Sequence, residues 1–301
     1  MNFDKNPKVL KNNILNNLVC IVGASGAIGK RMFHFFLNNL PNYQIEGTFY
    51  EKNTNNFIQL NIHDYEAVEI YIKTRRPYVI VWLSGTKDVI KCQKDNDYAF
   101  KMNCTPLEGL IKIIVKESPL TKVIYLSSDY VFDGTKGYYN EYDTCNPLTN
   151  YGKSKLKAEQ LLINSSVDYL ITRVSAVIIK GEGFIGWLTN QIKEKNLINL
   201  YSNTYFSPTP IDYLNNSIAM LIQLGTWEKR IVHIAGPRMS RFDFGIKIAS
   251  HLGVDSSFFV NDTADFENTT FQSDISLIPS IELEQISKDI WADFFKEISN
   301  D

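Results

Sequence analysis

The chain has 301 residues, of which 44% are hydrophobic and 21% are charged, and its formal net charge is −2. This is the composition of an ordinary globular protein, long enough for one large α/β domain or for two smaller lobes. A nearly neutral charge gives no electrostatic case for binding nucleic acid, which favours a strongly basic face. No apolar run approaches the roughly 18 residues that a membrane-spanning helix needs. We therefore expect neither a nucleic acid nor a membrane as a partner.

The N-terminal segment and the cysteines both indicate a cytoplasmic protein. Residues 1–17 are polar, rich in Asn and Lys, and lack the apolar core of a signal peptide. We read them as a short extension and leave a docking role open. The four cysteines form no Cys-x-x-Cys pair, which argues for a reducing cytosol rather than a disulfide framework. The four histidines show no metal-ligand spacing, so we expect no metal site.

The first predicted strand, 18–23, leads through a glycine-rich turn into a predicted helix. Gly23, Gly26 and Gly29 form the pattern GxxGxxG at this junction. Glycines permit a tight turn and let the backbone approach a pyrophosphate, while the helix N-terminus supplies N–H donors and the positive end of its dipole. Because the pattern lies between a strand and a helix, it favours dinucleotide binding over a simple tight turn.

The second predicted strand, 43–50, ends at two residues that bear on the choice of cofactor. Glu51 is placed to hold a ribose hydroxyl, as an acid at this point does in NAD-binding proteins. Lys52 is placed instead to face the 2′-phosphate of NADP. Both residues can also be read as solvated loop charges, so the sequence leaves NAD and NADP open.

Strands and helices continue to alternate toward the middle of the chain. We expect strands at 57–60, 78–83, 122–127 and 169–174, and helices at 64–74, at 96–117 and from about 149 onward. Strands with few polar residues that alternate with helices predict a parallel sheet covered on both faces. The strand at 122–127 leads into Ser127, Ser128 and Asp129. Ligands bind beyond the carboxyl ends of strands in such sheets, so these residues lie where chemistry is expected.

Tyr151 and Lys155 lie four residues apart at the start of a predicted helix, in the stretch TNYGKSKLKAEQ. Residues at this spacing share one helix face, so a phenol and an ammonium placed there can meet the same ligand. The plain alternative is a solvated, charged helix face. The glycine turn and the polar strand end, which come before this pair in the chain, favour a site.

In the second half of the chain, strands and helices alternate less regularly. We expect helices at 183–195, 210–225, 240–253 and 282–298, strands at 196–203 and 230–236, and a turn at 206–210. The fold class that follows is α/β, a Rossmann-like doubly wound parallel sheet with a smaller C-terminal lobe. We assign 18–175 to the dinucleotide-binding domain and 176–301 mainly to a substrate-binding lobe that is partly interleaved with it.

The motifs together resemble those of the extended short-chain dehydrogenases/reductases, which use GxxGxxG, a Ser or Thr, and YxxxK. More narrowly, the segments SSDYVFDG, NPLTNYGKSKLKAE and FSPTPIDYL resemble the dTDP-4-dehydrorhamnose reductase group. That group reduces the 4-keto carbon of nucleotide-linked deoxysugars with NAD(P)H. The resemblance runs from about Leu18 to the predicted C-terminal helix and is weaker after about Asp255.

The resemblance implies a role for each motif residue. Ser128, Tyr151 and Lys155 would be catalytic. The cofactor would contact Gly23, Ser25, Gly26, Ala27, Ile28, Gly29, Glu51, Lys52, Asn61, Ile62, Ser84, Gly85, Tyr151 and Lys155. The substrate would contact Thr86, Asp129, Ala176, Phe206 and Thr209. Ala176 stands where the group often has an aromatic residue, which puts rhamnose as the product in doubt, and residues 206–209 can equally be a turn that fastens the lobe.

The implied chemistry explains the residue types. Reducing a ketone needs a hydride at carbon and a proton at oxygen, and Tyr151 would give the proton. A nearby ammonium at Lys155 would stabilise the phenolate, lower the phenol pKa and hold the nicotinamide ribose. Ser128 would orient the carbonyl oxygen. Tyr130 competes as the proton donor, but only Tyr151 has a lysine four residues on.

Three functions are therefore weighed. The first is an enzyme that reduces a nucleotide-linked 4-keto-6-deoxysugar with NADPH or NADH, with NADPH slightly preferred. The second is another extended-family epimerase or dehydratase, although the acidic pair typical of dehydratases is missing from SSDYVF. The third is a regulatory subunit that binds the cofactor without turnover, similar to the beta subunit of methionine adenosyltransferase. A homodimer remains open.

Overall fold

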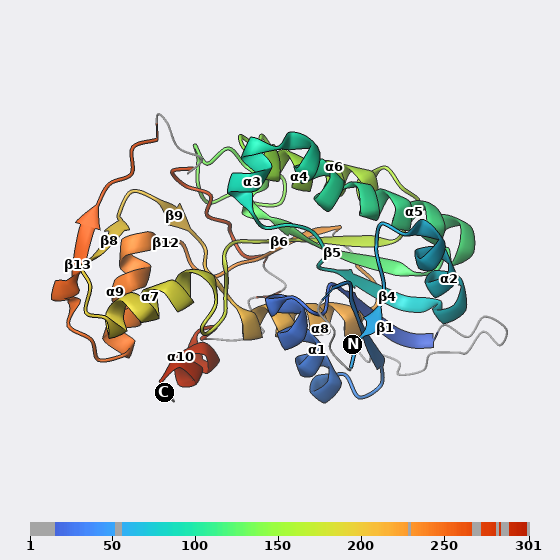
Figure 1. Cartoon of the computed structure of the whole chain (residues 1–301), viewed down its shortest axis with the longest axis horizontal. Coiled ribbons are helices and arrows are strands. Elements are labelled where there is room, and N and C mark those ends of the chain that lie inside the picture. Colours follow the sequence, from blue (N-terminus) through green and yellow to red (C-terminus); the bar gives the residue numbers. More distant parts are fainter. Residues whose placement is uncertain are drawn as a thin grey trace, which may run out of the picture.

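The computed structural model describes residues 16–51, 56–227, 230–266, 272–280, 283 and 289–299. Its centre is a seven-stranded sheet in the order β11-β6-β5-β4-β1-β2-β3, with every neighbouring pair parallel (Figure 1). The strands are β1 (Asn16–Val22), β2 (Gln44–Phe49), β3 (Ile58–Gln59), β4 (Pro77–Trp82), β5 (Lys122–Ser128), β6 (Tyr169–Val174) and β11 (Ile231–Ile234). The predicted Rossmann-like sheet is confirmed.

Helices cover both faces of this sheet. They are α1 (Ala27–Asn39) and α8 (Ile211–Leu224) on one face, and α2 (Tyr65–Arg75), α5 (Thr105–Glu117) and α6 (Asn150–Ile163) on the other (Figure 1). Alternate residues of β1 divide between the two cores: Val19 and Ile21 pack with α1 and α8, whereas Cys20 and Val22 pack with the other three helices. A strand buried on both faces has to be apolar throughout, which is the pattern that the sequence shows.

Side-chain caps fix the starts of three predicted helices. The Asp64 carboxylate accepts the Ala67 N–H at 3.1 Å, and the Thr149 hydroxyl accepts the Gly152 N–H at 3.0 Å. Ser240 accepts the Asp243 N–H at 3.0 Å at the start of α9 (Arg241–His251). Each bond satisfies one of the N–H groups that a helix start leaves without a partner. The Thr149 cap matters most here, because it fixes the turn that carries Tyr151.

The single helix expected at 96–117 is wrong. The structure has α4 (Asn96–Asn103) and α5 on either side of Cys104, and a short α3 (Val89–Lys94) that was not expected. Pro106 lies in the first turn of α5, where its missing N–H costs nothing, but it cannot continue the hydrogen-bond ladder of α4. The chain therefore stops one helix and starts another, and Asn103 comes to lie at the break.

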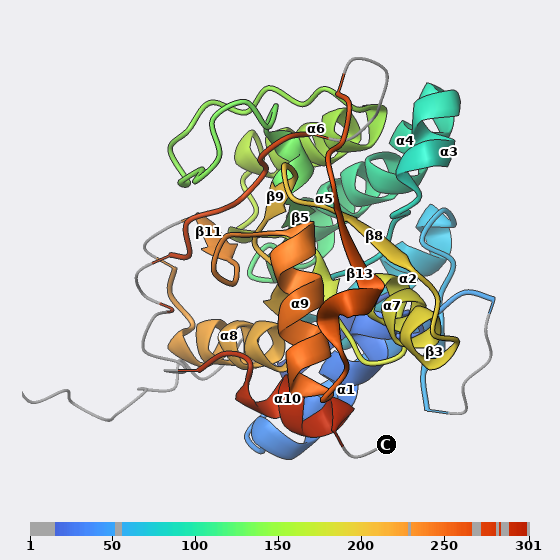
Figure 2. The same cartoon turned by 90° about the vertical axis from the view of Figure 1, so that its left-hand side faces the viewer.

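The remaining elements form a smaller lobe at one end of the sheet, which faces the viewer in Figure 2. It contains the paired short strands β7 (Val177–Ile178) with β10 (Thr209–Pro210), β8 (Ile198–Tyr201) with β13 (Phe259–Asp262), and β9 (Tyr205–Phe206) with β12 (Met239–Ser240). Helices α7 (Gly183–Lys193), α9 and α10 (Ala292–Ile298) surround a core that includes Phe206, Phe244 and Trp291. Of the helix expected at 282–298, the structure shows α10; residues 281–282 and 284–288 lie outside the described residues.

Two elements of the second half return to the central sheet. Helix α8 packs on α1, and β11 pairs with β6, placing Val232 beside Thr172 and His233 beside Arg173. The sheet is thus completed by residues beyond 175. The predicted extension falls almost wholly on residues 1–15, which lie outside the described residues. Within the described ranges, no helix is both long and apolar enough to span a membrane.

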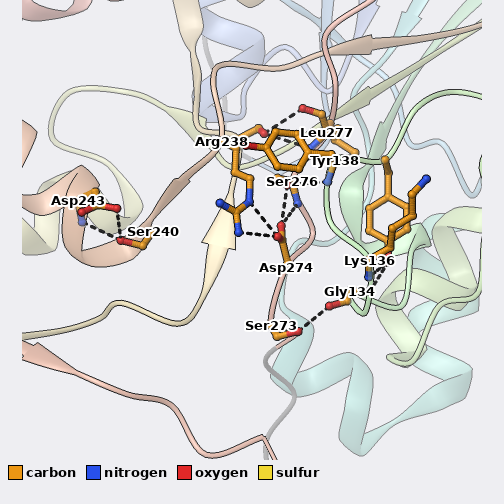
Figure 3. A network of polar contacts seen from close by, with 12 residues as sticks. Gly134, Lys136, Tyr138, Arg238, Ser240, Asp243, Ser273, Asp274, Ser276 and Leu277 are labelled. Atoms are coloured by element: carbon orange, nitrogen blue, oxygen red, sulfur yellow. Dashed lines mark hydrogen bonds and ion pairs between the residues drawn. The ribbon is translucent and has the colours of Figure 1, made fainter.

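A returning segment, residues 272–280, ties the loop after β5 to the smaller lobe; we call it the C-terminal strap (Figure 3). Its Asp274 carboxylate binds the Arg238 guanidinium at 2.8–2.9 Å, and Arg238 lies over the Tyr205 ring at 3.5 Å. The Asp274 N–H and the Ser273 hydroxyl both donate to the Gly134 carbonyl, at 3.0 and 2.6 Å. Through main-chain and side-chain contacts, the strap therefore joins the loop after β5 to the smaller lobe.

Candidate active site

The glycine-rich turn has the geometry that a pyrophosphate needs. Gly23 has φ of +90°, which other residues adopt at a cost, and the Gly26 N–H closes the turn onto the Gly23 carbonyl at 3.1 Å. A Cβ on Gly29 would lie 2.4 Å from the Gly23 oxygen, so only glycine lets α1 pack this close to the turn. A Cβ on Gly26 would meet nothing nearer than 3.4 Å, and no side chain caps α1. The helix N-terminus is thus open for an anionic group, and the turn fits a dinucleotide.

Other described residues expected at the cofactor lie at the same edge of the sheet. A Cβ on Gly23 would come within 3.1 Å of the Ser84 nitrogen, so the end of β4 lies against the glycine turn. Glu51 is exposed just after β2, and Lys52 lies outside the described residues. Asn61 and Ile62 are half-buried just after β3. These positions follow from the parallel order of the strands, whose carboxyl ends all meet at one edge.

The three residues expected to be catalytic lie together at this edge. Ser128 is the last residue of β5, and Tyr151 and Lys155 lie on successive turns at the start of α6. Lys155 is only 8% exposed; its Nζ donates to the Leu126 carbonyl at 2.7 Å and lies 4.3 Å from the centre of the Tyr125 ring. This lysine is not part of a solvated face. The reading of the pair as ordinary surface residues is therefore wrong for Lys155.

Burial controls the proton affinities of this pair. It raises the pKa of Tyr151 well above that of a free phenol, although a hydrogen bond with Ser128 acts the other way. Burial also lowers the pKa of Lys155 to about 8, against the attraction of the Glu159 carboxylate. The expected lowering of the Tyr151 pKa by Lys155 is not seen, because the effect of burial is larger, and the Lys155 ammonium contacts the Leu126 carbonyl. In this state Tyr151 holds its proton firmly, as a proton donor must.

Asn103 is a site residue that sequence reasoning missed. Its Oδ1 accepts the Thr86 N–H at 2.8 Å, and its Nδ2 donates to the Ser154 hydroxyl at 2.8 Å. Ser154 in turn donates to the Tyr151 carbonyl at 2.7 Å. Asn103 is 3% exposed and so links the loop after β4 to the first turn of α6. The sequence shows an amide at position 103, but no spacing indicates which residues it contacts.

Asp129 lies buried behind Ser128, and two further polar residues surround it. Its carboxylate accepts the Ser128 hydroxyl at 2.9 Å and the Ser175 hydroxyl at 2.6 Å. Arg241, the first residue of α9, lies 4.0 Å from the centre of the Phe206 ring and raises the local positive potential at Asp129 and Tyr130. Sequence reasoning missed Ser175 and Arg241, because neither forms a motif with the residues that it faces.

The remaining residues expected at the substrate differ in accessibility. Thr86 is half-buried after β4, and Ala176 is half-buried after β6, where its carbonyl accepts the Thr209 N–H at 2.9 Å. The Thr209 hydroxyl is fully buried and lies 3.2 Å from both the Ser207 and the Ile234 carbonyls. The Phe206 ring is 1% exposed beneath Arg241. Thr209 and Phe206 thus fasten the lobe, which was the alternative reading of this segment.

Comparisons with known proteins agree with this geometry. The chain is 27% identical to the dTDP-4-dehydrorhamnose reductase of Aggregatibacter actinomycetemcomitans over 76% of each protein. It is 30% identical to the methionine adenosyltransferase 2 subunit beta of Bos taurus over 65% of this chain and 55% of that protein. The chain therefore spans about half the length of this relative.

Solved structures and a family model extend the likeness over most of the chain. A hypothetical dTDP-4-dehydrorhamnose reductase from Sulfolobus tokodaii superposes with a TM-score of 0.78 at 26% identity, over 90% of this chain and 94% of that one. A Bacillus anthracis dTDP-4-dehydrorhamnose reductase in complex with NADP has the same fold, with a TM-score of 0.77 at 23% identity over 93% and 97%. The model of the RmlD substrate binding domain matches residues 17–280. The chain belongs to the RmlD substrate binding domain family.

Proposed function

We propose that the protein reduces the keto group of a nucleotide-linked 4-keto-6-deoxysugar with NADPH or NADH. The observation that carries the proposal is the grouping of buried Ser128, half-buried Tyr151 and buried Lys155 at the same sheet edge as an open, glycine-lined helix N-terminus. The relatives named as dTDP-4-dehydrorhamnose reductases support the substrate class. The choice of sugar would depend on the surroundings of Ala176, the position at which this chain departs from the group's pattern.

Each residue of the grouping has a task in such a reduction. The glycine turn and the first N–H groups of α1 would hold the pyrophosphate, and the bound cofactor would supply the hydride. Tyr151 would give its proton to the carbonyl oxygen, and the Lys155 ammonium would stabilise the phenolate that remains. Since Lys155 has a pKa of about 8, it carries its charge at neutral pH. Asn103, through Ser154, would hold the turn that presents Tyr151.

A regulatory subunit is the second candidate, and one observation favours it. The chain is 30% identical to a methionine adenosyltransferase 2 subunit beta, a protein named as a subunit and not as a reductase. The glycine turn serves cofactor binding equally well in such a protein. Tight binding of NADPH without turnover, together with a stable complex with a larger partner enzyme, would support this candidate.

The test is oxidation of NADPH and NADH by the purified protein with a panel of nucleotide-linked 4-keto-6-deoxysugars. We expect one panel member to be consumed, and Tyr151→Phe to lose roughly 10²–10⁴-fold in rate while keeping its affinity for the cofactor. Tyr130→Phe is the matched control. It removes the competing phenol, whose ring centre lies 5.5 Å from that of Tyr151. A greater loss in Tyr130→Phe would reassign the proton donor. Cofactor binding without turnover on any sugar would contradict the reductase proposal.

A further inference from the structure

The Ser128 hydroxyl has no free proton in the structure. Its Oγ accepts the Tyr130 N–H at 3.2 Å and donates to Oδ1 of Asp129 at 2.9 Å. A hydroxyl has one proton and two lone pairs, so one lone pair of Ser128 is left by these two bonds. While Asp129 is ionised, therefore, Ser128 can accept a hydrogen bond at the site but cannot donate one to a substrate carbonyl.

The two oxygens of Asp129 are held unequally. Ser175 donates to Oδ2 at 2.6 Å, and Ser175 is itself fixed because it accepts the Ser207 N–H at 3.2 Å. The bond from Ser128 to Oδ1 is longer, at 2.9 Å. Shorter bonds to a carboxylate are the stronger ones, so a proton added to Oδ1 gives up the weaker of the two. Protonation of Asp129 is thereby directed to the oxygen that faces Ser128.

We infer that Asp129 is a positioning residue that sets the direction of the Ser128 hydroxyl. The protein reduces the ketone in the state in which Asp129 is protonated. A proton from solvent, taken up on Oδ1, is donated toward the Ser128 Oγ. The two lone pairs of Ser128 are then occupied by Asp129 and by the Tyr130 N–H, so its own proton turns toward the substrate oxygen. Asp129 keeps its proton through the reaction. This inference rests on the proposed reductase function.

The groups facing Asp129 set the pH at which the change occurs. Tyr130 faces it from its own short helical turn (Asp129–Val131), Tyr151 from α6 and Arg241 from α9. Burial raises the pKa of Asp129 to about 6, while the hydrogen bonds from Ser175 and Ser128 and the Arg241 charge oppose that rise. The acid form therefore grows as the pH falls through about 6, well below the pH near 8 at which Lys155 loses its charge.

The first test is the pH dependence of the hydride-transfer rate in single turnovers with bound NADPH. We expect the wild-type rate to rise about tenfold or more between about pH 7.5 and about pH 5. Asp129→Asn should be fast throughout, because its amide donates to Ser128 permanently while its oxygen still accepts from Ser175. Asp133→Asn is the matched control, since the Asp133 pKa is already held to about 2 by Tyr139 and it should keep the wild-type profile. An Asp129→Asn variant whose rate rises toward low pH as the wild-type rate does overturns the inference.

The second test needs no turnover. The carboxyl carbon of Asp129 is followed by NMR through a pH titration of the folded protein, and its signal is assigned by its absence in Asp129→Asn. Ser128→Ala and Ser175→Ala should each move the midpoint to higher pH, because each removes a hydrogen bond that stabilises the carboxylate. An unmoved midpoint in Ser128→Ala overturns the inference. A shifted midpoint in a protein that turns over no sugar leaves the Asp129–Ser128 link in place and contradicts the reductase function instead.

Discussion

Asn103 shows how one amide can fix the backbone of Tyr151, the proposed proton donor, without touching its side chain. It bridges the Thr86 backbone and Ser154, and Ser154 holds the carbonyl of Tyr151. A buried donor or acceptor left without a partner costs roughly 1–3 kcal/mol, so the hydrogen bonds of Asn103 contribute to the stability of the site. The first turn of α6 is thus fixed from inside, by Asn103, as well as from its end, by the Thr149 cap.

We expect Asn103→Ala to lower kcat by roughly tenfold or more while the Kd for NADPH changes little, because the phenol is displaced and the glycine turn is untouched. Steady-state kinetics and cofactor fluorescence titration measure the two quantities. Asn216→Ala is the control, since this exposed amide on α8 donates to the Asp212 carbonyl of its own helix at 2.9 Å. An unchanged kcat in Asn103→Ala would show that Tyr151 is held by other contacts.

The residues that the sequence predicted at the site are those that belong to local patterns. The glycines, the polar end of β5 and the Tyr151–Lys155 spacing each lie within one strand–turn or one helix turn. Asn103 of α4, Ser175 just after β6 and Arg241 of α9 are far from these motifs in the sequence and reach the site through tertiary packing. Their contacts depend on tertiary packing, which no short spacing encodes.

At the scale of the element, the glycines of one motif meet two different requirements, which are the close packing of α1 and the space for a ligand. Gly29 is needed for packing, because its Cβ would lie 2.4 Å from the Gly23 oxygen and 2.7 Å from the Ala24 Cα. Gly26 has an extended backbone, with φ of −74°, and its Cβ would meet no protein atom nearer than 3.4 Å. The space in front of Gly26 is therefore open to a ligand.

We therefore expect Gly26→Ala to weaken NADPH binding by about tenfold or more, since the added methyl group occupies the space of the pyrophosphate, with little change in Tm. Gly29→Ala should lower both the affinity and the Tm, because α1 has to move away from the turn. Thermal unfolding and cofactor titration of both variants check this. Equal losses of Tm in the two variants would contradict the division of roles.

The elements were predicted well where they are long and periodic. The seven strands of the central sheet, α2, α6, α8 and α9 all lie within a few residues of their expected bounds. The break at Cys104 was missed because the apolar spacing continues across it, and the short pairs β7–β10 and β9–β12 were missed because two-residue strands have no periodicity to read.

At the scale of the whole molecule, a buried histidine makes stability depend on pH. His233 of β11 is fully buried beside Arg173 and edge-on to Phe132. Burial, with the nearby Arg173 charge, lowers its pKa to about 4 from 6.5. The neutral form is therefore the folded one, and its contribution to stability is complete above about pH 6.5 and is lost as the pH falls from there to about 4.

We expect His233→Gln to reduce the loss of unfolding free energy between about pH 7 and pH 5 by about 2 kcal/mol, since the unfolded histidine takes up a proton that the folded one refuses. Urea unfolding at the two pH values measures this. The raised pKa of Asp129 has the opposite effect on stability in part of this window, so the comparison is made variant against wild type. His34→Gln, at an exposed position of α1, is the control. A wild-type pH dependence in His233→Gln would contradict the assignment.

The C-terminal strap should contribute to stability and to the geometry of the site together. We expect Asp274→Asn to lower the unfolding free energy by about 1–2 kcal/mol, because the Arg238 guanidinium, with 24% of its side chain exposed, loses its ionic partner. Urea unfolding checks the loss. Glu108→Gln, which breaks an exposed pair with Lys112, should have a much smaller effect. Equal effects would show that the Arg238 pair is no more than a surface contact. No sequence pattern connects Asp274 with Gly134, so the strap was not foreseeable.

The return of α8 and β11 to the central sheet has a consequence for how the protein is made. Until residues 231–234 have left the ribosome, β6 is an open edge with unpaired backbone groups, and the apolar surface of α1 lacks its cover from α8. A nascent chain, or an expression fragment that stops near residue 175, thus exposes an unpaired strand edge at which chains associate with one another. The central sheet can therefore be completed only after residues 231–234 have emerged.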